Sequence, residues 1–327
     1  MSGRHLPVRR GRMKRRLTIG RRRRPSFLRR VEATMKSGGT ESRFELLFTR
    51  TPGYLFALLF RRIGATPTTI TLLSITLGVA SGWFMGQDGL QVRLGGIVLL
   101  IVANWLDCAD GQLARMTKHS SLSGRILDGF AGDLWFFSIY FFLCLRLQAT
   151  WGPFAWLAGA WAGMRCHARQ CALADYYRNV HIFLLSDGRD GEWDNSTAIA
   201  TRAAGLKWSE AGFEKLYLTC YARYTRSQER MTPGLQQFRR RIMSPEGPRL
   251  PEVLREKFRC GSQRLMPACN ALTFDARAII LYLSVAWGKP WLFLIAEATL
   301  FEALRHYTRR RHERLVRGLS EKLRCHA

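Results

Sequence analysis

The chain has 327 residues and a formal net charge of +27, and 47% of its residues are hydrophobic. The length would suit two soluble domains, but the apolar residues gather into blocks separated by basic stretches, as in a polytopic membrane protein. The charge predicts attraction to anionic surfaces such as phospholipid headgroups. None of the eight cysteines forms a CxxC pair, which argues against a zinc site and against a disulfide framework.

Residues 1–44 form a basic N-terminal segment. Its first thirty residues hold thirteen Lys or Arg and no acid, a composition typical of a disordered arm. It lacks the apolar core and cleavage site of a secretory signal peptide, which leaves an organellar transit peptide or a polybasic cytosolic arm. We expect no nucleic acid partner, because such a tract more often anchors the positive, inner side of a membrane protein.

Six apolar segments follow, and we expect each to cross a membrane as a helix. Residues 45–62 precede them and suit an interfacial helix. Several segments are shorter than the roughly twenty residues that cross the hydrocarbon, so flanking polar residues would have to continue those helices. The expected spans are residues 70–85, 94–106, 124–145, 154–174, 277–287 and 291–304.

The distribution of Lys and Arg predicts the orientation of these spans. If the basic N-terminus is cytosolic, every Arg-rich segment falls on the same side, together with both termini and the acidic cluster described below. The stretch 178–275 is too polar to cross and has apolar residues at helical spacing, which predicts amphipathic helices on the cytosolic face. Both a packing insert and a separate functional module fit this stretch.

These patterns predict an all-α polytopic membrane protein with six transmembrane helices and a helical cytosolic insert. We expect a bacterial inner membrane, with an organellar membrane as the other interpretation. A homodimer stays open. The expected divisions are a basic arm (1–44), an interfacial helix with four spans (45–177), the insert (178–275), two further spans (276–306) and a basic tail (307–327).

Several acids lie close together in the second and third spans. A carboxylate at membrane depth is costly unless it meets a cation or water, so such acids are functional candidates. Asp107 and Asp110 are three residues apart and project from one helix face, while Asp128 enters from the next span. Gly111 leaves the backbone open beside them, and Arg115 follows one turn later. Since Mg²⁺ takes carboxylates and completes its shell with phosphate oxygens, the sequence predicts a hard-cation site for a phosphorylated substrate.

The spacing of these residues resembles the signature of the CDP-alcohol phosphotransferase (phosphatidyltransferase) family. Seven of the signature's eight positions match, and the eighth, where the family has Asp, is Gly132. The resemblance covers residues 66–177, and the last two spans fit the family's six-helix plan. The matched residues are Asp107, Asp110, Gly111, Ala114, Arg115, Gly124 and Asp128.

The resemblance implies an enzyme of phospholipid synthesis that works in the lipid bilayer. CDP-diacylglycerol, or another CDP-alcohol, would bind with its pyrophosphate on Mg²⁺ or Mn²⁺, and a small alcohol acceptor would displace CMP. Transfer from a CDP-linked alcohol to diacylglycerol would use the same site. By matched position, the metal ligands would be Asp107, Asp110 and Asp128, and the nucleotide would contact Asp107, Gly111, Ala114, Arg115 and Gly124.

The resemblance implies that the Asp at the eighth position binds a second metal ion and takes the proton of the acceptor hydroxyl. Because Gly132 stands at this position, another residue would have to act as the base. Asp133 lies one residue beyond Gly132, and on a regular helix that step turns the carboxylate by about 100°. A π-bulge between Asp128 and Asp133 would return it to the metal face. We expect Asp133 to act with Asp128 as a catalytic residue and as a metal ligand. The alternative is a non-catalytic relative that binds nucleotide or lipid.

Two arginines of the fourth span are the candidates for binding the acceptor. Arg165 and Arg169 are one helical turn apart in the fourth span. They suit a phosphorylated polyol, because Arg binds phosphate through a bidentate fork. The other interpretation is that both side chains reach for cytosolic headgroups. Glu297, an acid in the last span, would either pair with an Arg or serve the reaction.

Overall fold

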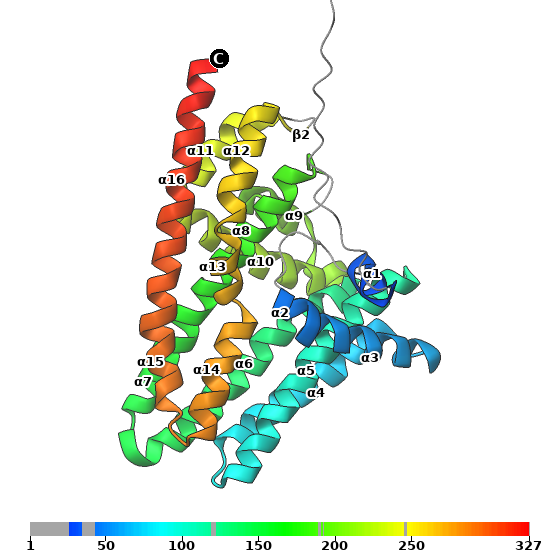
Figure 1. The fold of residues 1–327 in the computed structure, drawn as a ribbon, viewed down its shortest axis with the longest axis vertical. Coiled ribbons are helices and arrows are strands. Elements are labelled where there is room, and N and C mark those ends of the chain that lie inside the picture. Colours follow the sequence, from blue (N-terminus) through cyan, green and yellow to red (C-terminus); the bar gives the residue numbers. More distant parts are fainter. Residues whose placement is uncertain are drawn as a thin grey trace, which may run out of the picture.

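The computed structural model describes residues 26–34, 43–118, 122–188, 191, 193–244 and 247–326. These residues are helical except for loops and one small hairpin of β1 (Met243–Ser244) and β2 (Gly247–Pro248). The all-α prediction is therefore confirmed. The C-terminal helix α16, red in Figure 1, runs along one side of the molecule, and α4 and α5 lie on the other.

Three helices among the described residues are long and apolar enough to cross a membrane. They belong to α4 (Pro67–Gly86), α5 (Leu90–Thr117) and α6 (Leu122–Trp151), the last counted from Leu127. The shortest has 20 residues, or about 30 Å of helix, which matches the hydrocarbon thickness. The first three expected spans are thus present as candidate membrane helices. They run beyond the apolar blocks, so the acids of α5 and α6 lie inside regular helix.

The other three expected spans stay predictions. The fourth lies in a continuous helical run, and the sixth in a run after the short α14; each run contains a π-helical turn. Helix α14 has 13 residues, about 20 Å, which is short for a crossing. The elements are α7 (Phe154–Ala160), η2 (Trp161–His167), α8 (Ala168–Leu185), α14 (Phe274–Ala286), α15 (Trp291–Ala296), η3 (Glu297–Phe301) and α16 (Glu302–His326).

The segment predicted as an insert packs onto the ends of α8 and α16 that extend past the bundle (Figure 1). Tyr177 of α8, Phe238, Phe258 and Val316 of α16 are fully buried in one core. A shared core of this kind favours the packing-insert interpretation. The helices of this segment are α9 (Ser196–Gly205), α10 (Trp208–Met231), α11 (Pro233–Ile242), α12 (Glu252–Gln263) and α13 (Met266–Ala271).

Part of the predicted disordered arm is helical. Residues 26–33 form α1 (Ser26–Ala33), whose Phe27 ring packs edge-on against Tyr54, with 5.8 Å between the ring centroids. The apolar Val31 of this helix is fully buried, which explains why local composition misled the expectation there. Residues 1–25 and 35–42 lie outside the described residues.

The segment before the first span is helical and forms α2 (Arg43–Glu45), η1 (Leu46–Arg50) and α3 (Thr51–Arg62), while its position at the membrane interface stays a prediction. Leu55 and Leu59 are each 53% exposed, which suits a helix at the bilayer surface. The segment is fixed to α5, because the Trp105 indole donates a hydrogen bond to the Phe48 carbonyl at 2.8 Å. The Gln112 amide donates to the Arg50 carbonyl at 3.2 Å.

Glycines let α4 approach both of the acid-bearing helices. A Cβ at Gly82 would lie 2.7 Å from the backbone nitrogen of Ile139 in α6. A Cβ at Gly96 of α5 would lie 2.9 Å from the backbone nitrogen of Met85 in α4. In lipid there is no hydrophobic driving force between helices. Small residues at such crossings let the helices associate through close van der Waals packing instead. Helix α4 thereby holds α5 and α6 in register.

We predict that Gly82→Ala destabilises the fold. The new methyl group would meet backbone atoms that cannot yield, and overpacking of this kind costs about 1–3 kcal/mol. The matched control is Gly95→Ala, whose Cβ would lie 3.7 Å from Phe84, an ordinary contact. Thermal unfolding of both variants in detergent measures the difference, and equal midpoints would contradict the packing argument.

A fully buried ion pair fastens the helices of the other half. The Arg277 guanidinium of α14 donates to the Glu297 carboxylate of η3 at 2.6 Å and to the Gln170 side-chain oxygen of α8 at 2.7 Å. The Gln170 amide donates in turn to the Glu297 carbonyl at 3.0 Å. The sequence left two roles open for Glu297, an ion pair with an Arg or a part in the reaction. The structure shows the ion pair, with Arg277.

Removal of one charge of this pair should be more damaging than removal of both. Glu297→Gln leaves the Arg277 charge buried without a counterion, which costs about 3–5 kcal/mol. The double variant Glu297→Gln/Arg277→Gln has no stranded charge and should recover part of the loss. Thermal unfolding of both variants and the wild type provides the comparison. A double variant less stable than Glu297→Gln would contradict this account.

Candidate metal centre

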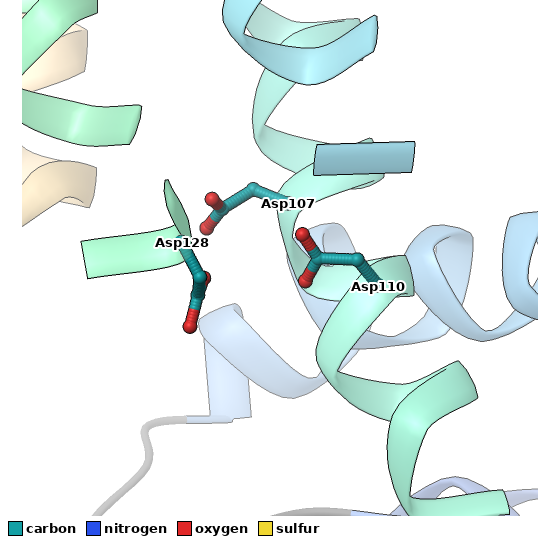
Figure 2. Close-up of side chains that lie close together, drawn as sticks. All are labelled: Asp107, Asp110 and Asp128. Carbon is teal, nitrogen blue, oxygen red and sulfur yellow. The ribbon is translucent and has the colours of Figure 1, made fainter. Parts of the chain in front are cut away.

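Three aspartates from two helices converge between α5 and α6. Asp107 and Asp110 project from α5 toward Asp128 of α6 (Figure 2). Each offers a carboxylate oxygen, and these oxygens lie within 4.8 Å of one another. Asp110 is buried, Asp107 is half-buried and Asp128 is exposed, so the centre has a closed side and an open side.

The local sequence explains this convergence. Three-residue spacing on α5 places Asp107 and Asp110 one turn apart on one face. Helix α5 ends at Thr117 and is capped by Lys118, whose left-handed conformation (φ 53°) and backbone N–H bond to the Ala114 carbonyl close the last turn. Helix α6 begins at Leu122. The short connection returns the chain, and Asp128 meets the acids of α5.

Thr71 of α4 is a partner that sequence reasoning missed. Its hydroxyl donates a hydrogen bond to Oδ2 of Asp110, and its side chain is buried. The bond orients the Asp110 carboxylate, and a carboxylate oxygen that accepts a hydrogen bond still has a lone pair that can bind a cation. A hydroxyl one turn into an apolar span was the available signal.

Arg50 of the interfacial segment was also missed. Its guanidinium lies within electrostatic reach of Asp107 and pairs with Glu45 at 3.4 Å. Only the folding of η1 onto α5 brings it there, so spacing along the chain gave no signal.

The nucleotide-binding candidates flank the centre. The Arg115 guanidinium packs over Gly111, 3.4 Å from where a Cβ would be, and its Nε donates to the Thr34 carbonyl at the end of α1. Ala114 and Gly124 are half-buried. Their contact with a nucleotide stays a prediction.

Asp133 is not part of the carboxylate cluster that the structure brings together. Helix α6 continues as regular α-helix through residues 128–133, so the predicted π-bulge is wrong. Five residues on a regular helix turn the side chain by about 140° relative to Asp128. The neighbouring Gly129 and Gly132 permit a distortion of the helix but do not impose one, and α6 keeps its regular α-helical turn.

The carboxylate of Asp133 faces a different neighbourhood. Burial raises the pKa of the Tyr224 phenol on α10 most, and electrostatic interactions with Asp175, Cys171 and then Asp133 raise it further. Asp133 is therefore near α10, in a part of the bundle where the insert meets the membrane helices. Its role as catalytic base and metal ligand stays a prediction.

The candidate acceptor residues lie in a cleft of their own. Arg165 and Arg169 line a cavity together with residues of α10 and α16. His167, between them in sequence, is buried instead and accepts or donates a hydrogen bond with the Tyr140 hydroxyl at 3.1 Å. The two arginines thus point away from the face of the helix that packs on α6.

The donor set of the aspartate centre fits a hard divalent cation. Three carboxylates so close together repel one another strongly in an apolar bundle. Carboxylate oxygens are the ligands that Mg²⁺ and Mn²⁺ prefer, and the open side at Asp128 leaves room for water or phosphate oxygens. The arrangement can therefore bind a cation that also binds a phosphorylated ligand.

Comparison with known families agrees with this geometry. Residues 65–180 match the family described as CDP-alcohol phosphatidyltransferase, and this range contains all three clustered aspartates. No curated protein and no solved structure is significantly similar to the chain. The chain therefore contains, over residues 65–180, a domain of the CDP-alcohol phosphatidyltransferase family.

Proposed function

We propose that this protein transfers a phosphatidyl group from CDP-diacylglycerol to a small polyol, either free or phosphorylated, and releases CMP. The family match supports phosphatidyl transfer from a CDP-alcohol. The observation that carries the proposal is the convergence of Asp107, Asp110 and Asp128 at the ends of two candidate membrane helices. In this proposal the protein lies in a bacterial inner membrane with both termini and the centre on the cytosolic side.

In this proposal different residues bind the cation and the nucleotide. Asp107, Asp110 and Asp128 would hold Mg²⁺ or Mn²⁺, with Thr71 fixing the orientation of Asp110. A bound divalent cation would neutralise the pyrophosphate charge and stabilise the leaving phosphate. Gly111, which has no side chain, would let the nucleotide approach the backbone of α5.

The reaction forms one bond and breaks one. The acceptor oxygen bonds to the phosphorus that carries the diacylglycerol, and the bond from that phosphorus to the bridging oxygen of CMP breaks. The hydroxyl proton needs an acceptor, and we assign this role to Asp133. Asp133 is exposed on α6, which suits an alcohol that enters from the side of α10.

Two alternatives use the same centre. A CDP-linked alcohol could serve as donor and diacylglycerol as acceptor, because the pyrophosphate would bind the same three aspartates. The second alternative is a non-catalytic relative that binds nucleotide or lipid, and the specific observation for it is Gly132 at the position where the family has Asp.

Loss of one clustered carboxylate should abolish turnover. We expect Asp107→Asn to reduce CMP release from CDP-diacylglycerol by about a hundredfold or more, because the cation loses a charged ligand. The assay uses the full chain in lipid with Mg²⁺ and with glycerol phosphate, inositol phosphate, inositol, serine or choline as acceptor. The control Asp88→Asn changes a carboxylate that is 98% exposed. Equal loss in both variants, or turnover that survives EDTA, would contradict the metal centre.

The positions 132 and 133 can be tested together. A Cβ at Gly132 would meet nothing within 4 Å, so Gly132→Asp should fold. If Asp133 is the base, Asp133→Asn removes CMP release, and the added change Gly132→Asp restores part of it.

The matched control is Gly129→Asp, whose Cβ also meets nothing within 4 Å. It should restore nothing, because its side chain would leave the face of Asp128. Turnover that survives Asp133→Asn would assign the base elsewhere. A wild-type chain that binds CDP but releases no CMP with any donor, and gains turnover through Gly132→Asp, would establish the non-catalytic alternative.

A further inference from the structure

A strongly basic cavity of about 500 Å³ lies where η2 and α8 meet α10 and α16. Each helix contributes arginines at helical spacing, so the same face of each helix carries them. The first helical run supplies Arg165 and Arg169, and α16 supplies Arg305 and Arg309. Helix α10 supplies Arg223, Arg226 and Arg230.

The charge of this cavity is far from balanced. Its lining holds seven guanidinium groups and a single carboxylate, that of Glu302. Glu302 is already engaged, because the Arg305 Nε donates to it at 2.9 Å. Arg226 and Arg230 form no ion pair within the described part of the chain. Guanidinium groups gathered in this way repel one another and favour an anion with several oxygens, such as a phosphate group.

If the fourth and sixth predicted spans cross the bilayer, the lengths of their helical runs place the cavity at the depth of a headgroup. Arg169 is fifteen residues beyond the start of α7 at Phe154, and Arg309 is eighteen beyond the start of α15 at Trp291. At 1.5 Å per residue these are about 22 and 27 Å, close to the thickness of the hydrocarbon core. If both helical runs begin at one surface of the bilayer, the arginines reach the other surface.

An apolar stripe leads from the cavity toward the opposite end of the same helical run. Leu157, Trp161 and Met164 are spaced like one face of a helix and are 66%, 57% and 80% exposed. The Arg165 guanidinium lies 5.5 Å from the centre of the Trp161 ring. The polar and apolar surfaces are therefore continuous, as a ligand with a charged head and an apolar chain requires.

We propose that this cleft binds an anionic phospholipid, with its phosphate among the arginines of α8, α10 and α16 and an acyl chain along Leu157, Trp161 and Met164. The site is distinct from the aspartate centre, because its lining includes none of Asp107, Asp110 and Asp128. In this proposal Arg165 and Arg169 bind the phosphate of the lipid and not that of an acceptor. A lipid held there joins the insert helix α10 to α16 at the membrane surface.

Binding of short-chain lipid to the full chain in a neutral detergent tests this proposal. The probes are dioctanoyl phosphatidate, dioctanoyl phosphatidylcholine and inorganic phosphate, titrated without nucleotide or divalent cation. The readout is therefore independent of the proposed transfer reaction. We expect phosphatidate to bind most tightly, and the affinity to fall as salt is raised, because the contacts are ionic.

The decisive variant is Arg226→Gln/Arg230→Gln. Loss of two charge-assisted contacts should weaken phosphatidate binding about tenfold or more. The control Arg240→Gln/Arg310→Gln removes the same charge from exposed residues outside the cleft and should change the affinity little. Equal weakening in both variants would reduce the site to unspecific attraction and overturn the proposal. Inorganic phosphate that binds as tightly as phosphatidate would overturn it too, because the ligand would then be a free phosphate.

Discussion

Repulsion among three carboxylates is the constraint on which the structure depends. Asp107, Asp110 and Asp128 offer oxygens within 4.8 Å of one another inside an apolar helical bundle. Such an arrangement costs free energy unless a cation compensates it. The surrounding elements keep the acids together all the same: Thr71 binds one of them, and glycines at the contacts of α4 with α5 and with α6 keep these helices at short distance.

The other half of the molecule also contains a buried charge, but there an opposite charge of the same chain compensates it. There the Arg277 charge is neutralised within the chain by Glu297, at 2.6 Å. A charge paired inside the chain needs no ligand, whereas a cluster of like charges does. By the same reasoning the arginines around α10 and α16 resemble the aspartates with the sign reversed, which is why we assign an anionic ligand to them.

The convergence of the three aspartates could be predicted from the sequence, because it depends on spacing between residues that are close along the chain. Spacing within α5 fixes the relation of Asp107 to Asp110, and a short connection returns Asp128 to them. Thr71 and Arg50 come from segments far away in sequence, and only packing brings them near. The π-bulge proposed for Asp133 was wrong because two glycines permit a distortion without imposing one. Helix α1 escaped notice because its stability comes from packing on α3.

The central claim is that the three aspartates bind a divalent cation that also holds the nucleotide's phosphates. Electron paramagnetic resonance of Mn²⁺ bound to the full chain, with phosphorus hyperfine coupling recorded in the presence of CDP, tests it most directly. The account predicts one class of bound Mn²⁺ that shows coupling to CDP phosphorus and is lost in Asp110→Asn. Mn²⁺ that binds equally well to that variant, or shows no coupling to phosphorus, would contradict it.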